Sequence, residues 1–194
     1  MAEQEHSDNS GVAPQPTDRL FFAVYPDPAT AERISHLARR LLSEHGLHGN
    51  PFATQRLHVT LHYLGDHVGV PDDIVTSACA AAAATVAAPC DLRFDRVASF
   101  DRKRRKRPLV LLSGDEATPL VRMRDALGEA MVAAGLERWV SPHFTPHVTL
   151  LYDDRRLAER AVEPIGWTAH EFVLMRSVLG QTRHMALGRW PLCG

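Results

Sequence analysis

Two stretches of the sequence decide the fold, "RLHVTLHYLG" at Arg56–Gly65 and "FTPHVTLLYD" at Phe144–Asp153. Both contain the string His-Val-Thr-Leu, and in both the polar and apolar side chains alternate, which is typical of β-strands. Successive side chains of a strand point to opposite faces of its sheet. We therefore expect the polar sets His58, Thr60, His62 and His147, Thr149 to face away from Leu57, Val59, Leu61, Tyr63 and from Val148, Leu150, Tyr152.

The repetition of this string is more informative than either copy alone. With eleven histidines in the chain, average residue usage predicts about 0.05 copies of His-x-Thr-Leu, so two copies are an event on the order of 10⁻³. A single His-x-Thr in a strand is more often a surface or packed histidine than a functional one. The pair therefore indicates a shared function.

The composition is that of an ordinary globular protein. The chain has 194 residues, of which 45% are hydrophobic and 23% charged, enough to bury a core without staples. Its net charge of −1 gives no general argument for a nucleic-acid partner. Three cysteines without a C-x-x-C pair fit a disulfide framework poorly. Because we find neither a long apolar run nor a signal peptide, we expect a soluble, cytoplasmic protein, and a monomer.

The remaining pattern predicts a disordered tail over residues 1–17, followed by a single domain over residues 18–194 in which strands and helices alternate. Gly46 is expected to end the first helix, and Thr118 and Pro119 to begin the third. The expected helices cover residues 27–46, 72–88 and 118–136, and the expected strands residues 19–26, 56–65, 90–100, 107–114, 143–153, 171–180 and 184–192. This order predicts an α+β or mixed α/β fold in two related halves, with helices on one face of the sheets.

Two histidines on one sheet surface, each beside a hydroxyl, suit phosphodiester chemistry without a metal. A neutral imidazole can take a proton from water, and an imidazolium opposite can give one to the departing oxygen. The threonine hydroxyls can donate hydrogen bonds to the non-bridging phosphate oxygens. The two motifs are identical in sequence, so the sequence does not indicate which histidine is the acid.

Two His-x-Thr-hydrophobic motifs about ninety residues apart resemble the two-histidine (2H) phosphoesterase superfamily. The closer resemblance is to the RNA 2′,3′-cyclic phosphodiesterase family, also called LigT-like or 2′-5′ RNA ligase. It rests on the two motifs, on "RLFFAVYP" as an opening strand, and on "FVLMRSVLG" and "ALGRWPL" as closing strands. The resemblance covers residues 19–192 in family order.

The resemblance implies a bilobal α+β fold with pseudo-two-fold symmetry, antiparallel sheets lining a central groove and helices outside. It implies hydrolysis of RNA terminal 2′,3′-cyclic phosphates to 2′-phosphomonoesters, in some members with 2′-5′ ligation, and no cofactor. Carried onto this chain, His58 is the proton donor, His147 the proton acceptor, and Thr60 and Thr149 hold the phosphate. The expected partner is an RNA end that carries a cyclic phosphate.

Four further residues are candidates for substrate binding. Arg107 closes the basic run at residues 102–107, which is either a solvated loop or a phosphate-binding edge. Phe21 is either plain core or a base-stacking wall, and Arg176 is either an edge residue or a phosphate ligand. His184 stands near the place where the family often carries a nucleotide-contacting tyrosine, and imidazole can stack on a base too.

A metal site is not expected. His62 and His143 each lie four residues from a motif histidine, but on strands this spacing separates the side chains by about 13 Å.

Two other functions remain open at this point. The first is a non-catalytic module that binds RNA ends, although binding alone does not need a paired acid and base. The second is a sister phosphodiesterase that acts on small cyclic nucleotides.

Overall fold

The computed structural model describes residues 14–101, 106–114, 118–181 and 183–193. Most of the expected tail and residues 102–105 of the basic run lie outside the described residues. No helix in the described part of the chain is long and apolar enough to cross a membrane.

The strands form one eight-stranded antiparallel sheet in the order β6-β3-β4-β5-β2-β1-β7-β8. Their bounds are β1 Asp18–Val24, β2 Val59–His67, β3 Cys90–Ser99, β4 Arg107–Ser113, β5 His147–Asp153, β6 Arg160–Ala169, β7 Glu171–Val178 and β8 Arg183–Pro191. The seven expected strands are all present.

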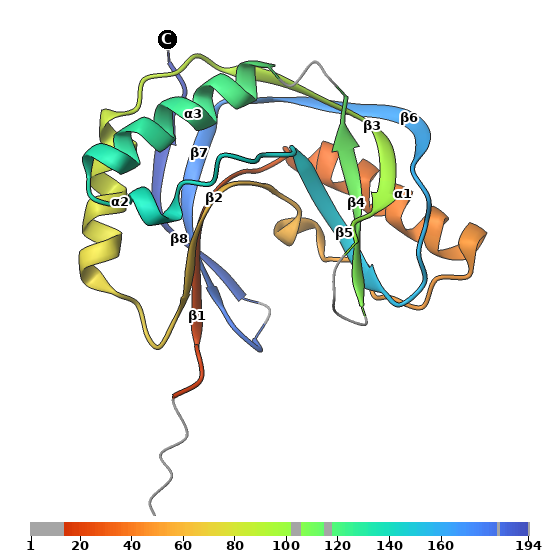
Figure 1. Ribbon diagram of the computed structural model, residues 1–194. Helices are drawn as coiled ribbons and strands as arrows, with labels where there is room; N and C mark the ends of the chain where they lie inside the picture. Colours follow the sequence, from red (N-terminus) through yellow and green to blue (C-terminus); the bar gives the residue numbers. More distant parts are fainter. Residues whose placement is uncertain (1–13, 102–105, 115–117, 182, 194) are drawn as a thin grey trace, which may run out of the picture.

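The sheet consists of two lobes joined at a single residue pair. β1, β2, β7 and β8 form the first lobe, β3 to β6 form the second, and β2 pairs with β5 only at Val59 and Val148. Figure 1 shows the lobes inclined toward each other on either side of this junction. The predicted bilobal α+β fold is confirmed.

The helices are α1 Pro28–His45, α2 Asp72–Ala84 and α3 Thr118–Ala133, with the short 3₁₀ turns η1 Thr54–Arg56 and η2 Glu137–Trp139. The carboxylate of Asp27 caps α1 by accepting the Thr30 backbone N–H at 2.9 Å, and Gly46 ends it with φ 57°. Although α1 follows β1, it contacts β5 and β6 of the second lobe (Figure 1). α2 and α3 pack on each other, α2 contacts β8 of the first lobe, and α3 contacts β2 of the first lobe and β3 of the second.

Strand β6 is absent from the strands that the sequence pattern predicts. Pro164 and Gly166 interrupt its alternation, and both usually argue against a strand. The structure explains Pro164, because β6 is the edge strand of the second lobe, where a missing backbone N–H is tolerated. A Cβ at position 166 would lie 2.5 Å from the Leu92 carbonyl oxygen, so only glycine lets β3 approach this closely.

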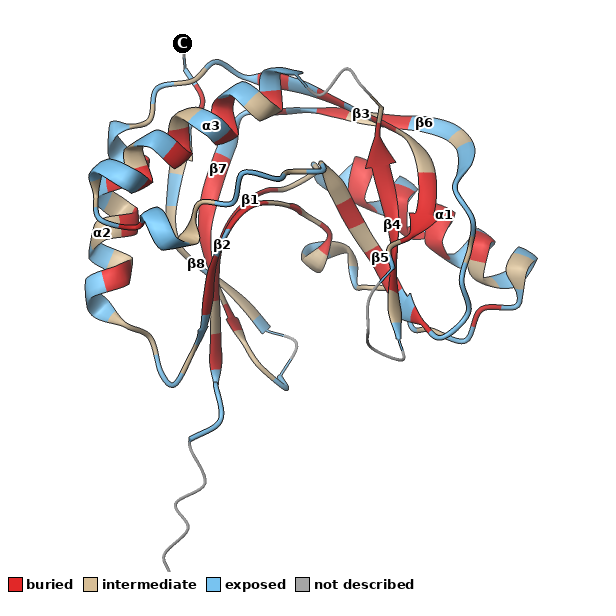
Figure 2. Ribbon diagram, in the orientation of Figure 1, coloured by how far each residue is buried: buried red, intermediate tan, exposed pale blue. Residues whose placement is uncertain are grey.

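Both faces of the sheet carry buried apolar side chains, but one face carries many more than the other. The main core lies between the sheet and the helices. In Figure 2 the strands β1, β4 and β7 are mostly buried, while the outer helix surfaces are exposed. The opposite face, called the inner face below, carries two small apolar clusters. One comprises Phe21, Ala23, Val173 and Met175 in the first lobe, and the other Ala98, Val110 and Leu112 in the second.

Each motif strand contains a β-bulge, so its side chains do not alternate between the two faces as the sequence predicted. In β2, His62 lies opposite Phe22 and Thr60 opposite Ala23, so Leu61 is an extra residue. His62 and Tyr63 therefore point to the faces opposite to those expected, until a second irregularity at Leu64 restores the alternation. His62 turns to the helix side, where its Nε2 lies 2.9 Å from the Arg124 carbonyl oxygen.

The same irregularity recurs in β5. Thr149 lies opposite Val110 and Leu151 opposite Leu109, so Leu150 is the extra residue. In both strands the tyrosine five residues after the motif histidine therefore shares the inner face with the histidine and threonine, and not the apolar face. Tyr63 and Tyr152 are the exposed aromatic side chains that result, at 44% and 37% exposure.

The carboxylate of Asp153 ties the end of β5 to the segment that leads toward His58. It accepts the backbone N–H groups of His48, Gly49 and Arg155 at 2.5, 2.6 and 2.8 Å. Burial opposes ionisation of this carboxyl group, but the three N–H donors outweigh burial and lower its pKa.

We expect Asp153→Asn to lower the free energy of unfolding by about 1–3 kcal/mol, because the amide can no longer accept hydrogen bonds from all three backbone N–H groups. Urea denaturation measures this difference. The exposed Glu129→Gln change on α3 is the control and should stay within about 0.5 kcal/mol of the wild type. Equal midpoints for all three proteins would contradict the assigned role of Asp153.

Candidate active site

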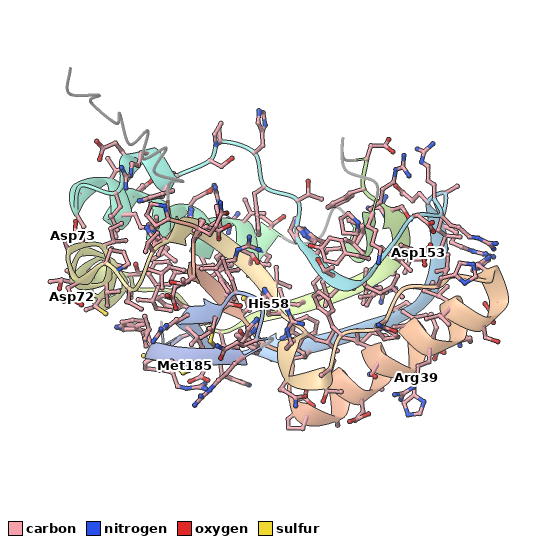
Figure 3. The ribbon with its side chains drawn as sticks, turned by 90° about the horizontal axis from the view of Figure 1, so that it is seen from below. Arg39, His58, Asp72, Asp73, Asp153 and Met185 are labelled. Atoms are coloured by element: carbon pink, nitrogen blue, oxygen red, sulfur yellow. The ribbon has the colours of Figure 1, made fainter. Side chains whose placement is uncertain are left out.

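The two motif histidines meet at the junction of the lobes. His58 directly precedes β2, His147 is the first residue of β5, and each is followed by one member of the bridging pair Val59 and Val148. Seen from below in Figure 3, His58 lies near the middle of the molecule. The junction thus brings together two residues that are 89 positions apart in the sequence.

Both imidazoles are held by the same hydrogen bond. Nδ1 of His58 lies 2.7 Å from the carbonyl oxygen of Arg56, and Nδ1 of His147 lies 2.7 Å from the carbonyl oxygen of Thr145. Each carbonyl belongs to the residue two positions earlier and can only accept, so Nδ1 carries the proton. Nε2 of each ring is then an acceptor when the ring is neutral and a donor when it is protonated.

Each histidine also packs on an aromatic ring of the inner face. His58 stacks on Phe21 with ring centroids 4.8 Å apart, and Tyr25 lies 5.5 Å from it on the same face. His147 meets the edge of Phe100 at 5.0 Å. Phe21 belongs to the small apolar cluster of the first lobe, and Phe100 packs on that of the second. Carbonyl and phenyl ring together fix the orientation of each imidazole.

The surroundings of His58 favour its neutral form. Burial lowers its pKa to about 4 although the bond to the Arg56 carbonyl opposes this, and the charges of His184, His147 and Arg56 lower it further. In the absence of an anion, His58 is therefore neutral at pH 7. Negative charge placed beside it would favour the imidazolium.

His184 on β8 lies in the same place. Its ring centroid is 5.6 Å from that of His58 and 5.7 Å from that of Phe21. Burial, followed by the positive charge of Arg56, lowers the pKa of His184 to about 4. The sequence-based expectation that His184 belongs to the site agrees with this position, and its contact with a base stays a prediction.

Arg56 is a component of the site that the sequence analysis missed. Its guanidinium lies over the Phe52 ring at 4.4 Å, and its Nε is buried without a hydrogen-bond partner among the described residues. It contributes positive charge beside His58 and His184. The sequence repeat could have pointed to Arg56, because Arg56 lies two residues before the first motif histidine, as Thr145 does before the second.

The two threonines lie on the inner face beside their histidines. Thr60 stands opposite Ala23 and Thr149 opposite Val110, and both are half-buried. Phe21 lies directly in the site, but it is only 3% exposed and its ring is covered by His58. It therefore supports the histidine and offers no free face for stacking on a base, contrary to that part of the expectation.

Arg176 is not in the site. It stands opposite Leu20, on the helix side of the sheet, whereas its neighbour Met175 stands opposite Phe21 on the inner face. Its Nε donates to the buried Asp18 carboxylate at 2.6 Å. The role of phosphate ligand is wrong, because the strand directs this side chain to the other face.

Arg107 is likewise held away from the histidines. It shares one face of β4 with Leu109 and Leu111, which lie in the main core. Its guanidinium donates to the Asp154 carbonyl oxygen at 3.2 Å and lies 4.0 Å from the Asp101 carboxylate. The predicted direct contact of Arg107 with substrate is therefore not supported by its position.

Within the described ranges, no group of three or more His, Cys, Asp or Glu side chains is arranged to hold a metal ion. His62, one of the two histidines weighed as a ligand, points to the helix side as described above.

This fold with its paired His-x-Thr strands defines a two-histidine phosphoesterase. A family model described as the 2′-5′ RNA ligase superfamily matches residues 26–181, and the chain belongs to this family. Among curated proteins, none matches the chain.

Solved structures agree with this assignment. E. coli LigT in its apo form is similar with a TM-score of 0.72 and 25% identity, over 93% of this chain and 100% of that chain. A protein from Thermus thermophilus has the same fold, with a TM-score of 0.72 and 21% identity, over 90% of this chain and 97% of that chain.

We expect His58 of the free protein to titrate in NMR spectra with a pKa of about 4. Inorganic phosphate should raise this pKa, because the anion stabilises the imidazolium. Phe21→Ala should also raise it, because water then reaches the ring. A His58 that titrates near 6.5 in the free wild-type protein would contradict the effect of burial described here.

Proposed function

We propose that the protein hydrolyses the terminal 2′,3′-cyclic phosphate of RNA to a 2′-phosphomonoester without a metal ion. The observation that carries this proposal is the pair of imidazoles at the junction of the lobes, each with Nδ1 bonded to a backbone carbonyl. Because this bond occupies Nδ1, proton transfer falls to the Nε2 atom of each ring. A positioned general acid and general base can supply both proton transfers of phosphodiester hydrolysis.

In the proposed reaction, Nε2 of neutral His147 takes a proton from water as the water oxygen attacks phosphorus. The bond from phosphorus to the 3′ oxygen breaks in line with the attack, and Nε2–H of protonated His58 gives its proton to that oxygen. The products are a 2′-phosphomonoester and a free 3′ hydroxyl. Thr60 and Thr149 donate hydrogen bonds to the non-bridging oxygens, where charge accumulates in the transition state.

The donor role of His58 depends on the substrate. The free protein favours neutral His58, so a bound phosphate diester must supply the negative charge that stabilises the imidazolium. Arg56 opposes this effect near His58 but attracts the same anion. On this proposal the acid is formed mainly in the complex with substrate.

Related proteins support a nucleotide substrate. E. coli LigT has been crystallised with 3′-AMP and with NADP+. The family description also names 2′-5′ ligation, in which a 5′ hydroxyl would take the place of the water and His147 would accept its proton. Ligation therefore uses the same two histidines and is a second outcome of the same site.

We expect His58→Ala and His147→Ala each to lower the rate on an oligonucleotide with a cyclic phosphate end by about 10²–10⁴-fold, because proton transfer contributes this much. EDTA should leave the wild-type rate unchanged, and His36→Ala on the outer face of α1 is the matched control. Activity that EDTA abolishes, or that survives both histidine changes together, would contradict the proposal.

The same assay separates the two other functions. A binding module would retain the oligonucleotide and leave its cyclic phosphate intact. An enzyme for small cyclic nucleotides would turn over a mononucleotide cyclic phosphate much faster than the RNA end.

A substrate with sulfur in place of the 3′ oxygen assigns the two roles, because a thiolate leaves without help from an acid. We expect this substrate to restore the rate of His58→Ala to near that of the wild type, while His147→Ala stays slow. Restoration of His147→Ala alone would reverse the assignment of donor and acceptor.

A further inference from the structure

The chain reaches His147 through residues 134–146, which connect α3 to β5 and are called the α3–β5 segment below. In Figure 1 this segment leaves the end of α3 and crosses to the start of β5 in the second lobe. It contains Thr145, whose carbonyl oxygen holds Nδ1 of His147. Resting on the proposed function, we infer that Arg124 of α3 is a positioning residue for His147, because it fixes this segment in place.

Arg124 is a buried arginine whose guanidinium is bonded to the middle of the α3–β5 segment. The residue is only 5% exposed. Its Nη2 donates a hydrogen bond to the carbonyl oxygen of Ser141, and its Nη1 donates to the Asp125 carboxylate at 2.9 Å. Its guanidinium also lies 5.3 Å from the centroid of the Phe144 ring. Burying a charged side chain destabilises a protein unless the charge is paired and hydrogen-bonded, so these contacts hold side chain and segment together.

A tight turn carries this restraint to the anchor of His147. The Ser141 hydroxyl donates to the carbonyl oxygen of His143 at 3.1 Å and accepts the backbone N–H of the same residue at 3.2 Å. Phe144 follows, with its ring against the Arg124 guanidinium. Arg124 thus restrains the α3–β5 segment at Ser141 and at the residue directly before Thr145.

Helix α3 is itself fastened to the strand of the first motif. Nε2 of His62, two residues after Thr60, donates to the backbone carbonyl oxygen of Arg124 at 2.9 Å. One turn further along α3, a Cβ at Gly128 would lie 3.3 Å from His62 Cε1 and 3.3 Å from Cγ1 of Val140. Gly128 therefore lets α3 pack closely against β2 and against the α3–β5 segment at once. Arg124 connects the strand of one motif with the histidine anchor of the other.

The strands alone join the two motifs at a single point. β2 pairs with β5 only at Val59 and Val148. One bridging pair sets the distance between two strands but leaves the angle between them to other contacts. The angle matters for proton transfer, since a misplacement of about 1 Å can cost about 10²-fold in rate. A second connection beside His147 therefore serves catalysis directly.

A comparable restraint acts at the other histidine. The buried carboxylate of Asp153, on the strand of the second motif, accepts two backbone N–H groups of the segment that follows α1. That segment leads to Arg56, whose carbonyl oxygen holds Nδ1 of His58. In each half, a buried charged side chain thus ties the anchor of one histidine to the strand of the other motif.

Two variants test the role of Arg124. Arg124→Met keeps the aliphatic stem and removes every donor. Ser141→Ala removes the hydroxyl of the turn at an exposed position, so it leaves the fold intact and decides the question if Arg124→Met does not fold. The matched controls are Arg176→Met, which deprives the buried Asp18 of its partner far from the histidines, and Ser43→Ala on the exposed side of α1.

Nitrogen-15 NMR of the neutral imidazoles shows which ring nitrogen carries the proton. We expect Nδ1–H for both His58 and His147 in the wild type. In Arg124→Met, His147 should become a mixture of the two tautomers, whereas His58 should stay Nδ1–H because its anchor lies in another segment. The same two results, with a smaller change at His147, are expected for Ser141→Ala.

Kinetics on an oligonucleotide with a cyclic phosphate end give the second readout. Arg124→Met should lower kcat by about 10- to 100-fold and leave KM unchanged, because His147 is misplaced in the transition state while the substrate still binds. Ser141→Ala should lower kcat by about 3-fold. Arg176→Met should lower the midpoint of urea denaturation but keep the wild-type kcat and both tautomers, and Ser43→Ala should match the wild type throughout.

Wild-type kcat or an unchanged His147 tautomer in folded Arg124→Met would overturn the inference, and so would a change of both histidines together, which indicates a general loosening of the fold. If Arg124→Met does not fold, a wild-type tautomer in Ser141→Ala would overturn it. If the wild-type protein cleaves no cyclic phosphate, the proposed function fails, and the tautomer of His147 still shows whether Arg124 orients this ring.

Discussion

The site depends on one contact between strands, the bridge of β2 and β5 at Val59 and Val148. Both residues are fully buried, and each follows a motif histidine directly. Because the two strands pair at this point and then separate, the lobes meet at the histidines and diverge around the space beside them. A longer ladder would close this space, and no pairing would leave the histidines unrelated.

The second constraint is the way each imidazole is anchored. A hydrogen bond from Nδ1 to the carbonyl oxygen two residues earlier selects one tautomer, and a phenyl ring supports the imidazole plane. The two sites are alike in these contacts but unlike in charge, since Arg56 and His184 surround His58. The internal duplication thus supplies two equivalent groups, and the neighbours of each group make them different.

Much of this could be predicted from the sequence, and the exceptions have physical reasons. The period of the apolar residues and the capping residues of α1 located the helices and seven strands, and the repeated motif located both histidines and threonines. The bulges at Leu61 and Leu150 could not be predicted, because an extra residue leaves no mark in an alternating pattern. They decide that His62 faces α3 and that Tyr63 faces the inner side. β6 was missed for the opposite reason, since Pro164 and Gly166 conceal an edge strand.

The central claim is that His58 and His147 act on one phosphate from opposite sides, so that the bond from phosphorus to the 3′ oxygen breaks. The most direct measurement is phosphorus NMR of the product from an oligonucleotide with a 2′,3′-cyclic phosphate end. A single 2′-phosphomonoester is the expected product. A 3′-phosphomonoester, a mixture of the two, or an unchanged cyclic phosphate would contradict it.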